Sequence, residues 1–526
     1  MSLLKRREIL TALLGAGAAS SFSGLNMLLP NIAHAAAKAP DQSYKAMVVL
    51  FMSGGNDAFN MIVPTGPDSD TGYGAYKQSR ADFAIGQRSL GEPMLGHNAY
   101  VHGVSNDGEA YLQGTYGFDE LGIGVNALMP EFAQLMLDKK AAVVANVGTM
   151  LEPVTKSSLL TARLPPFLYA HNHQQRALET GWADNLSAAG WAGRIAELWR
   201  SSADDGVSYD SPLGLNISFG GQTRMMTSPN DRPVVLDPYD NALFDSHYAG
   251  FDTGVFKALN SSGATDPIQR LIRDTNRRAA VISELLAKNQ NNMGDFSDYQ
   301  DPYGNPLFAT PTLGQLQMNT ELHGGLLSSA ESAAHMLALG KYTLGLNRQI
   351  IYISLGGFDT HANQLNQHPT LLRELSLAIW SFQKAMDAMN MSEDVTLFTL
   401  SDFGRSLGNN GNGTDHGWAG HNLVVGGGVN GGTVVGEMPD LHLGGDSDTG
   451  SKGRMIPGIA IDQYLATLCH WFGLSDEENA AIFPNLNNFR AEGSPKVSSA
   501  YLVELFKSQK RDKGILRRTL KALLQV

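Results

Sequence analysis

Cysteine is almost absent from this chain. Cys469 is the single cysteine among 526 residues, so an intramolecular disulfide is excluded. Zinc knuckles and iron–sulfur clusters are excluded as well, because each needs several thiolates. Any metal ion must therefore be held by histidine, aspartate and glutamate side chains.

Charged residues are scarce, at 17% of the chain against 43% hydrophobic residues. This balance is typical of a globular protein rather than a disordered, collagen-like or membrane-spanning one. The formal net charge is −12. Because an acidic surface repels phosphate backbones, we expect no nucleic-acid partner.

Several catalytic and nucleotide-binding motifs are also missing. The chain contains no GxxxxGK[ST] loop, and its single GxGxxG match, at 426–431, is not followed by a predicted helix, although glycine is plentiful at 57 residues. It has neither a GxSxG elbow nor an HExxH helix. Nucleotide binding and serine-hydrolase chemistry therefore lack their usual sequence signatures.

The first 35 residues have the pattern of an export signal. Lys5-Arg6-Arg7 forms a twin-arginine motif, a moderately apolar stretch runs over 10–29, and Ala33-His34-Ala35 offers small residues for cleavage. A membrane anchor is disfavoured because polar residues interrupt the apolar stretch and Pro30 ends it. We predict a twin-arginine signal peptide over 1–35, export by the twin-arginine translocase, and a periplasmic or secreted protein.

Buried strands alternate with amphipathic helices along the rest of the chain. The strands are continuous apolar runs, which are typical of a parallel sheet covered on both faces. The helices have apolar residues three and four apart. We predict an α/β fold with a mostly parallel central sheet and helices on both faces. The expected strands are 46–52, 141–147, 349–355, 395–400 and 422–427, and the expected helices 128–138, 267–288, 322–339, 371–389 and 461–472.

We predict one large domain over residues 36–506. Two stretches of low propensity, near 64–125 and 289–320, are expected to be surface loop insertions. Residues 507–526 form a basic amphipathic pattern. For this segment we favour a terminal helix docked on the acidic body over a peripheral contact with a membrane.

Polar residues that can bind metal ions lie beside four of the predicted strands. In an open α/β sheet, ligands bind beyond the carboxyl ends of the strands. A single aspartate there is usually a helix cap or turn residue, and a single histidine is usually a polar side chain with ordinary hydrogen-bond partners. Four such clusters favour a shared metal site, although caps and loops without a metal remain the alternative. The candidate ligands are Asp57, Asp359, His361, Asp402, His416 and His421.

These clusters resemble the motifs of a known bacterial family. The chain resembles the domain-of-unknown-function 1501 family of twin-arginine-exported proteins along most of its length after the signal. That family is similar to the alkaline phosphatase and sulfatase superfamily, whose members cleave phosphate or sulfate esters with two metal ions beside a nucleophile. The matching stretches are 54–57, 356–361, 401–405, 415–418, 462–464 and 471–473.

The resemblance implies a role for each ligand. Asp359 and His361 resemble the aspartate and histidine of the superfamily's first metal site, and His416 resembles the last histidine of that site. Asp57 resembles the first-strand aspartate of the second metal site. Asp402 resembles the aspartate of an Asp-His pair after a central strand.

Two positions depart from the superfamily's pattern. Phe403 stands where the Asp-His pair has its histidine, and His421 is the candidate replacement. Ala170 stands where a serine nucleophile is expected, and alanine cannot attack phosphorus or sulfur. A divalent cation can still lower the pKa of water toward 7. His171 and His173 are then candidate acids or bases near neutral pH.

Two functions fit these observations. The first is an exported hydrolase of phosphate or sulfate esters that uses one or two divalent cations: zinc, manganese or calcium. Arg405 would clamp the oxyanion of the substrate, or else form a salt bridge on a helix. The alternative is a non-catalytic cell-envelope protein that binds a metal or a polyanion on a degenerate phosphatase-like scaffold. Ala170 and Phe403 favour this alternative, whereas the carboxylate and imidazole ligands that are present favour the hydrolase.

Overall fold

The computed structural model describes residues 43–87, 114–201, 211–239, 266–316 and 318–507, together with residues 90, 93, 95, 112 and 260. The predicted signal peptide and the basic segment after Lys507 lie outside these residues. The chain divides into residues 1–39 and Pro40–Val526, and only the second unit is described below.

A nine-stranded sheet lies at the centre of the described residues. Its order is β13-β5-β12-β9-β1-β8-β6-β7, and β14 also pairs with β5. All neighbouring pairs are parallel except those made by β12, which is antiparallel to both β5 and β9. The strands are β1 Lys45–Met52, β5 Ala141–Gly148, β6 Asn216–Ser218, β7 Val234–Val235, β8 Arg348–Leu355, β9 Val395–Ser401, β12 Gly420–Val425, β13 Val434–Val435 and β14 Ile459–Ala460.

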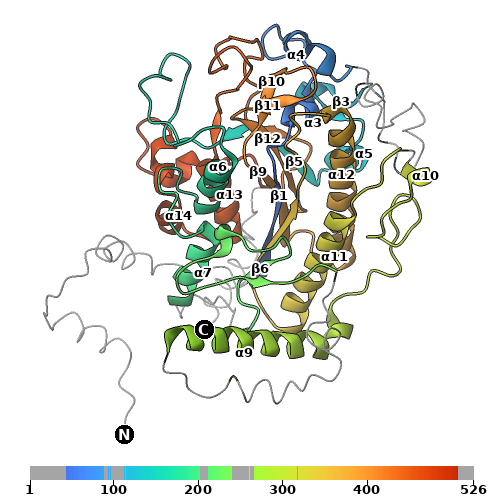
Figure 1. The fold of residues 1–526 in the computed structure, drawn as a ribbon, viewed down its shortest axis with the longest axis vertical. Helices are drawn as coiled ribbons and strands as arrows, with labels where there is room; N and C mark the ends of the chain where they lie inside the picture. The colour runs from blue at the N-terminus through green and yellow to red at the C-terminus, as the bar shows by residue number, and fades with distance from the viewer. Residues whose placement is uncertain are drawn as a thin grey trace, which may run out of the picture. The chain divides into compact units, whose positions relative to one another are not determined.

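Helices cover both faces of this sheet, as the apolar strands predict. In β1, Val48 and Leu50 belong to one hydrophobic cluster, whereas Val49 and Phe51 belong to another on the opposite face. Figure 1 shows the sheet between α5, α11 and α12 on one side and α6, α7, α13 and α14 on the other. These helices are α5 Pro130–Leu137, α6 His171–Thr180, α7 Trp191–Ser201, α11 Gly325–Ala338, α12 Gln364–Ala388, α13 Ile461–Phe472 and α14 Asp476–Ile482.

The segment near 64–125 is more regular than its composition indicates. It contributes α4 (Tyr73–Arg80) and a small antiparallel sheet in which β4 (Ile123–Asn126) pairs with β2 (Ile62–Pro64) and β3 (Thr115–Phe118). Tyr76 and Val125 are buried in the same core as one face of β1. Short β-runs among glycine and aspartate residues are hard to recognise from sequence, and here tertiary packing stabilises them.

The remaining helices show where local signals mislead. Helix α12 begins at Gln364, seven residues before the predicted start, and contains Pro369 near its beginning. A proline usually marks the first turn of a helix, which is why the pattern predicts a later start.

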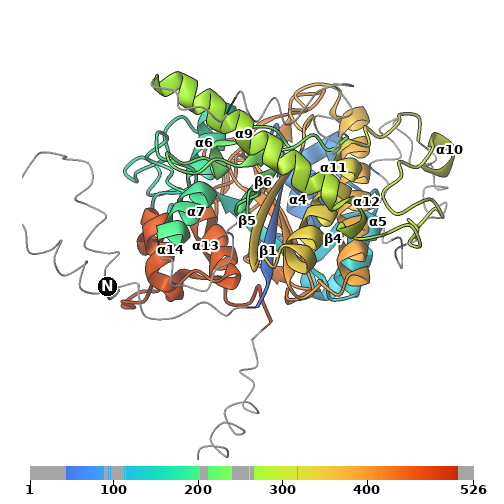
Figure 2. The same ribbon diagram turned by 90° about the horizontal axis from the view of Figure 1, so that it is seen from below.

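Helix α9 (Pro267–Lys288) agrees with its prediction and runs across one end of the sheet (Figure 2). Among the described helices, none is both long and apolar enough to span a membrane. Short helices complete this part of the chain at α3 Ala58–Met61 and α10 Leu313–Leu316.

Candidate metal centre

Two of the predicted clusters meet because their strands are neighbours of β1. Strand β8 ends just before Asp359 and His361, and β9 ends just before Asp402. Both strands run parallel to β1 on either side of it, so their carboxyl ends lie at the same edge. The hairpin of β10 (Arg405–Asn409) and β11 (Thr414–His416) brings His416 to this edge, and α6 begins there with His171.

Two glycines after β1 allow these segments to approach one another. Gly54 has φ +118°, and a Cβ at this position would lie 2.4 Å from the backbone nitrogen of Asp359. Gly55 has φ +79°, and a Cβ there would lie 2.6 Å from the ring of Phe403. Other residues would be strained by these backbone angles and would also clash, so the site requires glycine at both positions.

Three histidines direct the same ring nitrogen, Nε2, toward one oxygen of Asp359. The Nε2 atom of His416 lies 3.0 Å from Nε2 of His171 and 2.7 Å from Nε2 of His361. The Oδ1 atom of Asp359 lies 3.2–3.4 Å from all three nitrogens. Ligand atoms that share a tetrahedral cation at bond lengths of about 2.0–2.2 Å lie about 3.3–3.6 Å apart, close to the distances from Asp359, whereas the imidazole nitrogens are closer together than that. Ligand atoms of His171, Asp359 and His416 all lie within 4.8 Å of one another.

The opposite ring nitrogens fix the tautomers of two of these histidines. Nδ1–H of His416 donates to the backbone carbonyl of Tyr169 at 2.6 Å, and Nδ1–H of His171 donates to Oδ2 of Asp402 at 2.6 Å. Nδ1 of His361 lies 3.5 Å from a carboxylate oxygen of Asp415. The Nε2 atoms of His171 and His416 therefore carry their lone pairs toward each other. Lone pairs at these distances repel unless a proton or a cation lies between them, and such Nδ1 partners are typical of metal-bound histidines.

The charges around the cluster shift the pKa values of its members in different directions. The hydrogen bond to Asp402 raises the pKa of His171, whereas burial lowers the pKa of His416. Burial disfavours the charged form of Asp359, but the hydrogen bond from Arg405 and the nearby histidines lower its pKa overall. An ionised Asp359 and a neutral His416 are the forms that a divalent cation requires.

Arg405 holds the site together, and each of the three nitrogens of its guanidinium already donates to a protein group. It lies in β10 and not on a helix, and its side chain is buried. Its guanidinium donates to the carbonyls of Gly54, Phe358 and Thr414 and to Oδ1 of Asp359. The predicted oxyanion clamp is therefore a residue that positions Asp359.

Asp57 is not brought into the cluster. Its carboxylate forms a fully buried ion pair with Arg80 and also accepts a hydrogen bond from the amide of Gln364. Both oxygens are thus occupied by donors from α4 and α12. The guanidinium already supplies the positive charge that a second cation would bring to this carboxylate.

Two of the predicted histidines also lie apart from the cluster. His421 is fully buried, burial lowers its pKa to about 3, and its Nδ1 accepts the backbone N–H of Asn146 at 3.1 Å. His173 is half-buried on α6, where its ring packs against Phe167 with centroids 4.1 Å apart. Neither has a contact with Asp359 among the described residues.

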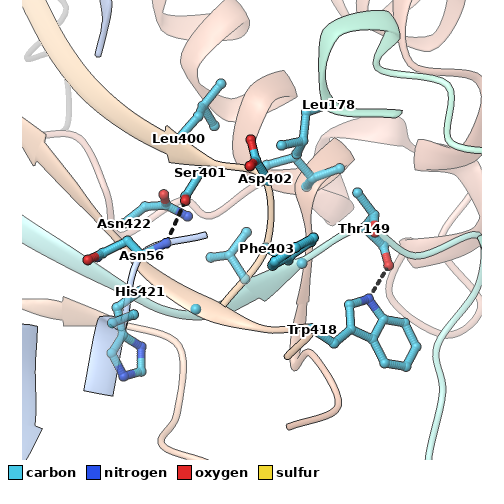
Figure 3. Close-up of a pocket in the computed structure, with 15 residues that line it drawn as sticks. Asn56, Thr149, Leu178, Leu400, Ser401, Asp402, Phe403, Trp418, His421 and Asn422 are labelled. Atoms are coloured by element: carbon cyan, nitrogen blue, oxygen red, sulfur yellow. Dashed lines mark hydrogen bonds between the residues drawn. The ribbon is translucent and has the colours of Figure 1, made fainter. Parts of the chain in front are cut away.

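Phe403 occupies the space beside two of the imidazoles. Its ring centroid lies 4.6 Å from that of His171 and 4.7 Å from that of His416. A cavity of about 20 Å³, room for roughly one water molecule, is bordered by Asp402, Phe403 and Trp418 (Figure 3). Ala170 immediately precedes α6 and offers no hydroxyl group to the site.

Some contributors to the site have no signal in the sequence. The carbonyl of Tyr169 orients His416, and any residue can supply a carbonyl. Asp415 precedes His416 in a predicted motif, but its approach to His361 depends on the β10–β11 hairpin. Arg454 donates from Nε to the carbonyl of His416 at 3.0 Å from a loop 38 residues away.

Comparisons with known proteins bear on the family. Among solved structures, a phosphonate monoester hydrolase from Silicibacter pomeroyi is 11% identical, with a TM-score of 0.28, over 65% of this chain and 68% of that one. A TM-score of this size does not establish a shared fold, so the architecture rests on the strand order given above. A search of curated proteins found no match. Residues 317–484 match the family described as "Protein of unknown function (DUF1501)", which confirms the predicted resemblance to that family over this part of the chain.

Proposed function

We propose that this protein is a metal-dependent hydrolase of phosphate or sulfate esters. The observation that carries the proposal is the convergence of the Nε2 atoms of His171, His361 and His416 around Oδ1 of Asp359. The resemblance of the surrounding motifs to the phosphatase and sulfatase superfamily supports the choice of ester.

The donor set favours a single zinc ion. Imidazole nitrogens suit zinc better than calcium, which takes oxygen ligands, and manganese also prefers oxygen. His171, His416 and Asp359 would hold the ion, and His361 borders it, with its Nε2 2.7 Å from Nε2 of His416. Because Arg80 already neutralises Asp57, we propose one ion per chain and not two.

The chain's own residues would orient the reaction. A bound divalent cation supplies Lewis acidity and lowers the pKa of water toward 7, which replaces the hydroxyl that Ala170 lacks. Asp402 orients His171, the carbonyl of Tyr169 orients His416, and Arg405 holds Asp359. His173 is half-buried on α6, two residues after His171, and is the candidate proton donor or acceptor.

The test combines metal content with an ester screen. The protein should be purified without chelators and analysed for metal by mass spectrometry, then assayed on aryl phosphate, phosphonate and sulfate esters. We expect about one equivalent of zinc and hydrolysis of one ester class, with both lost in Asp359→Asn. The matched control is His173→Ala, which should retain its zinc. A chain without bound metal would contradict the proposal.

The alternative is a non-catalytic metal-binding protein of the cell envelope. It is favoured by Ala170 before α6 and by the packing of Phe403 on two of the imidazoles, which leaves less room for a substrate. This alternative predicts bound zinc together with no hydrolysis of any ester in the screen.

We also propose export by the twin-arginine route to the periplasm or the medium. The Arg6-Arg7 pair at the start of the chain supports this proposal. Replacing both residues by lysine should retain the protein in the cytoplasm in a cell-fractionation experiment. Normal export of that variant would contradict it.

A further inference from the structure

Arg454 is held beside the metal centre by His416 and by Tyr169, the residue that positions His416. Its Nε donates to the carbonyl of His416 at 3.0 Å. Its guanidinium also stacks on the ring of Tyr169, with Cζ 4.4 Å from the ring centroid. The Tyr169 carbonyl is the group that accepts Nδ1–H of His416. Arg454 therefore contacts both a member of the cluster, His416, and the residue that orients it, Tyr169.

These contacts orient the guanidinium but leave its ends available. Within the described part of the chain, no hydrogen-bond acceptor contacts Nη1 or Nη2 of Arg454, and the side chain is half-buried. Arg405, by contrast, uses its donors on backbone carbonyls and on Asp359. A fork of N–H donors that is held by stacking suits the paired oxygens of a tetrahedral oxyanion.

The charge balance around the cluster also favours an anion. Asp359, Asp402 and Asp415 surround the histidines, and one divalent cation together with Arg405 balances their charge. Arg454 and the exposed Lys452, whose Nζ lies 3.5 Å from Asp415, outnumber the one further carboxylate, Asp448, which accepts the backbone N–H of Arg454, and so leave a positive excess. A positive site next to a metal attracts a dianion more strongly than a neutral ligand.

We propose that Arg454 forms an oxyanion subsite beside the metal centre and binds two non-bridging oxygens of a tetrahedral phosphate or sulfate group. This inference rests on the proposed function, because it takes the metal centre as the place where the group is held. It assigns the role predicted for Arg405 to a residue from a distant loop.

The test measures anion binding and not hydrolysis. Inorganic phosphate and sulfate are titrated separately into the zinc-loaded full chain, freed of unbound zinc, and binding is followed by calorimetry. In Arg454→Gln, Kd for the anion that binds should rise about 10- to 100-fold, which is the loss expected for charge-assisted hydrogen bonds. Arg454→Lys keeps the charge but lacks the planar fork, so its Kd should lie between those of the unmodified chain and of Arg454→Gln. The matched control is Arg163→Gln, which removes the same charge from an exposed side chain paired with Glu152.

Each outcome decides the inference. Binding by Arg454→Gln within threefold of the unmodified chain would overturn it, as would a zinc-loaded chain that binds neither anion. Loss of zinc from both Arg454 variants would assign the residue a structural role on His416 and would also overturn it. A chain that binds no zinc would contradict the proposed function instead, and Arg454 would then be judged by the same titrations on the metal-free protein.

Discussion

The three histidines of the cluster differ in the group that orients each of them. Asp402 is charged and buried, the Tyr169 carbonyl is neutral, and Asp415 is partly exposed and more distant from its histidine. A charged partner raises the basicity of the imidazole that it contacts, and so strengthens that imidazole as a ligand. His171 is therefore the ligand that depends most on a single carboxylate.

The first residue-scale prediction concerns Asp402. Asp402→Asn keeps an acceptor for Nδ1–H of His171 but removes the negative charge, so zinc affinity should fall about 10- to 100-fold. Competition with a chromogenic chelator measures this change. His173→Ala, two residues along the same helix, serves as the control and should bind zinc as the unmodified chain does. Unchanged affinity in Asp402→Asn would show that His171 is not a ligand.

The second residue-scale prediction concerns Asp462, a buried carboxyl at the start of α13. Neither of its oxygens has a hydrogen-bond partner among the described residues, and burial raises its pKa to about 8. Between the unfolded pKa and this value the unfolded chain releases the proton and the folded chain keeps it. This group therefore lowers stability as pH rises through that range, with a slope of up to about 1.4 kcal/mol per pH unit.

Asp462→Asn removes this titration. The free energy of unfolding is measured with urea at pH 5 and at pH 7.5 for both proteins. The value for Asp462→Asn minus the value for the unmodified chain should be larger at pH 7.5 than at pH 5. All other groups titrate alike in the two proteins, so the difference isolates Asp462. A difference that is constant between the two pH values would mean that Asp462 is ionised in the folded chain.

Among the elements, β5 and β12 pair with an irregular register next to the site. Asn146 has φ +55° within β5, and the register shifts between Gly420 and Asn422 in β12. The Nδ1 atom of His421 accepts the backbone N–H of Asn146 that the bulge releases. His421 thus stabilises a strand irregularity from inside the core.

This arrangement predicts a structural phenotype for His421→Ala. The variant leaves a buried N–H without an acceptor and creates a cavity against Phe59, so the free energy of unfolding should fall by about 2–4 kcal/mol. Denaturant unfolding measures the loss. Zinc stoichiometry should be unchanged, and its loss with stability intact would instead make His421 a ligand.

The ion pair of Asp57 and Arg80 links the turn after β1 to α4. Arg80→Met would leave a buried carboxylate without its cation and should cost about 3–5 kcal/mol of unfolding free energy. The double variant Arg80→Met/Asp57→Leu removes both charges and should recover much of this loss. A double-mutant cycle in denaturant measures the coupling, and additive losses would show that the two charges do not interact.

Most strands and helices could be predicted from the sequence. The groups that contact the residues at the ends of these strands could be predicted only in part. Apolar runs predict β8 and β9, and the parallel arrangement then brings Asp359 and Asp402 to one edge. The same reasoning places Asp57 at that edge, but it cannot reveal Arg80, which reaches Asp57 from α4 across 23 residues. For the same reason the sequence does not distinguish Arg405 from Arg454. All three guanidinium nitrogens of Arg405 donate to protein groups, whereas the guanidinium of Arg454 donates from Nε alone among the described residues.

At the scale of the whole described unit, the metal centre joins segments that are far apart in the chain. It draws on α6, on the loop after β8 and on β11, and Asp402 after β9 contacts it. A ligand that binds only the folded chain stabilises it by RT ln(1 + [L]/Kd), which is about 4 kcal/mol at a thousandfold excess over Kd. Because the ligands come from separate elements, this energy stabilises the whole unit against unfolding.

The last prediction follows from that linkage. Removal of zinc with EDTA should lower the melting temperature by on the order of 4 °C, and added zinc should restore it. Calorimetry of the chain with zinc, with chelator and after zinc is returned measures the shift. In Asp359→Asn the melting temperature should not respond to either treatment, which separates the centre from adventitious surface binding. Equal responses in this variant and in the unmodified chain would place the zinc elsewhere, because Asp359 is the carboxylate that contacts all three imidazoles.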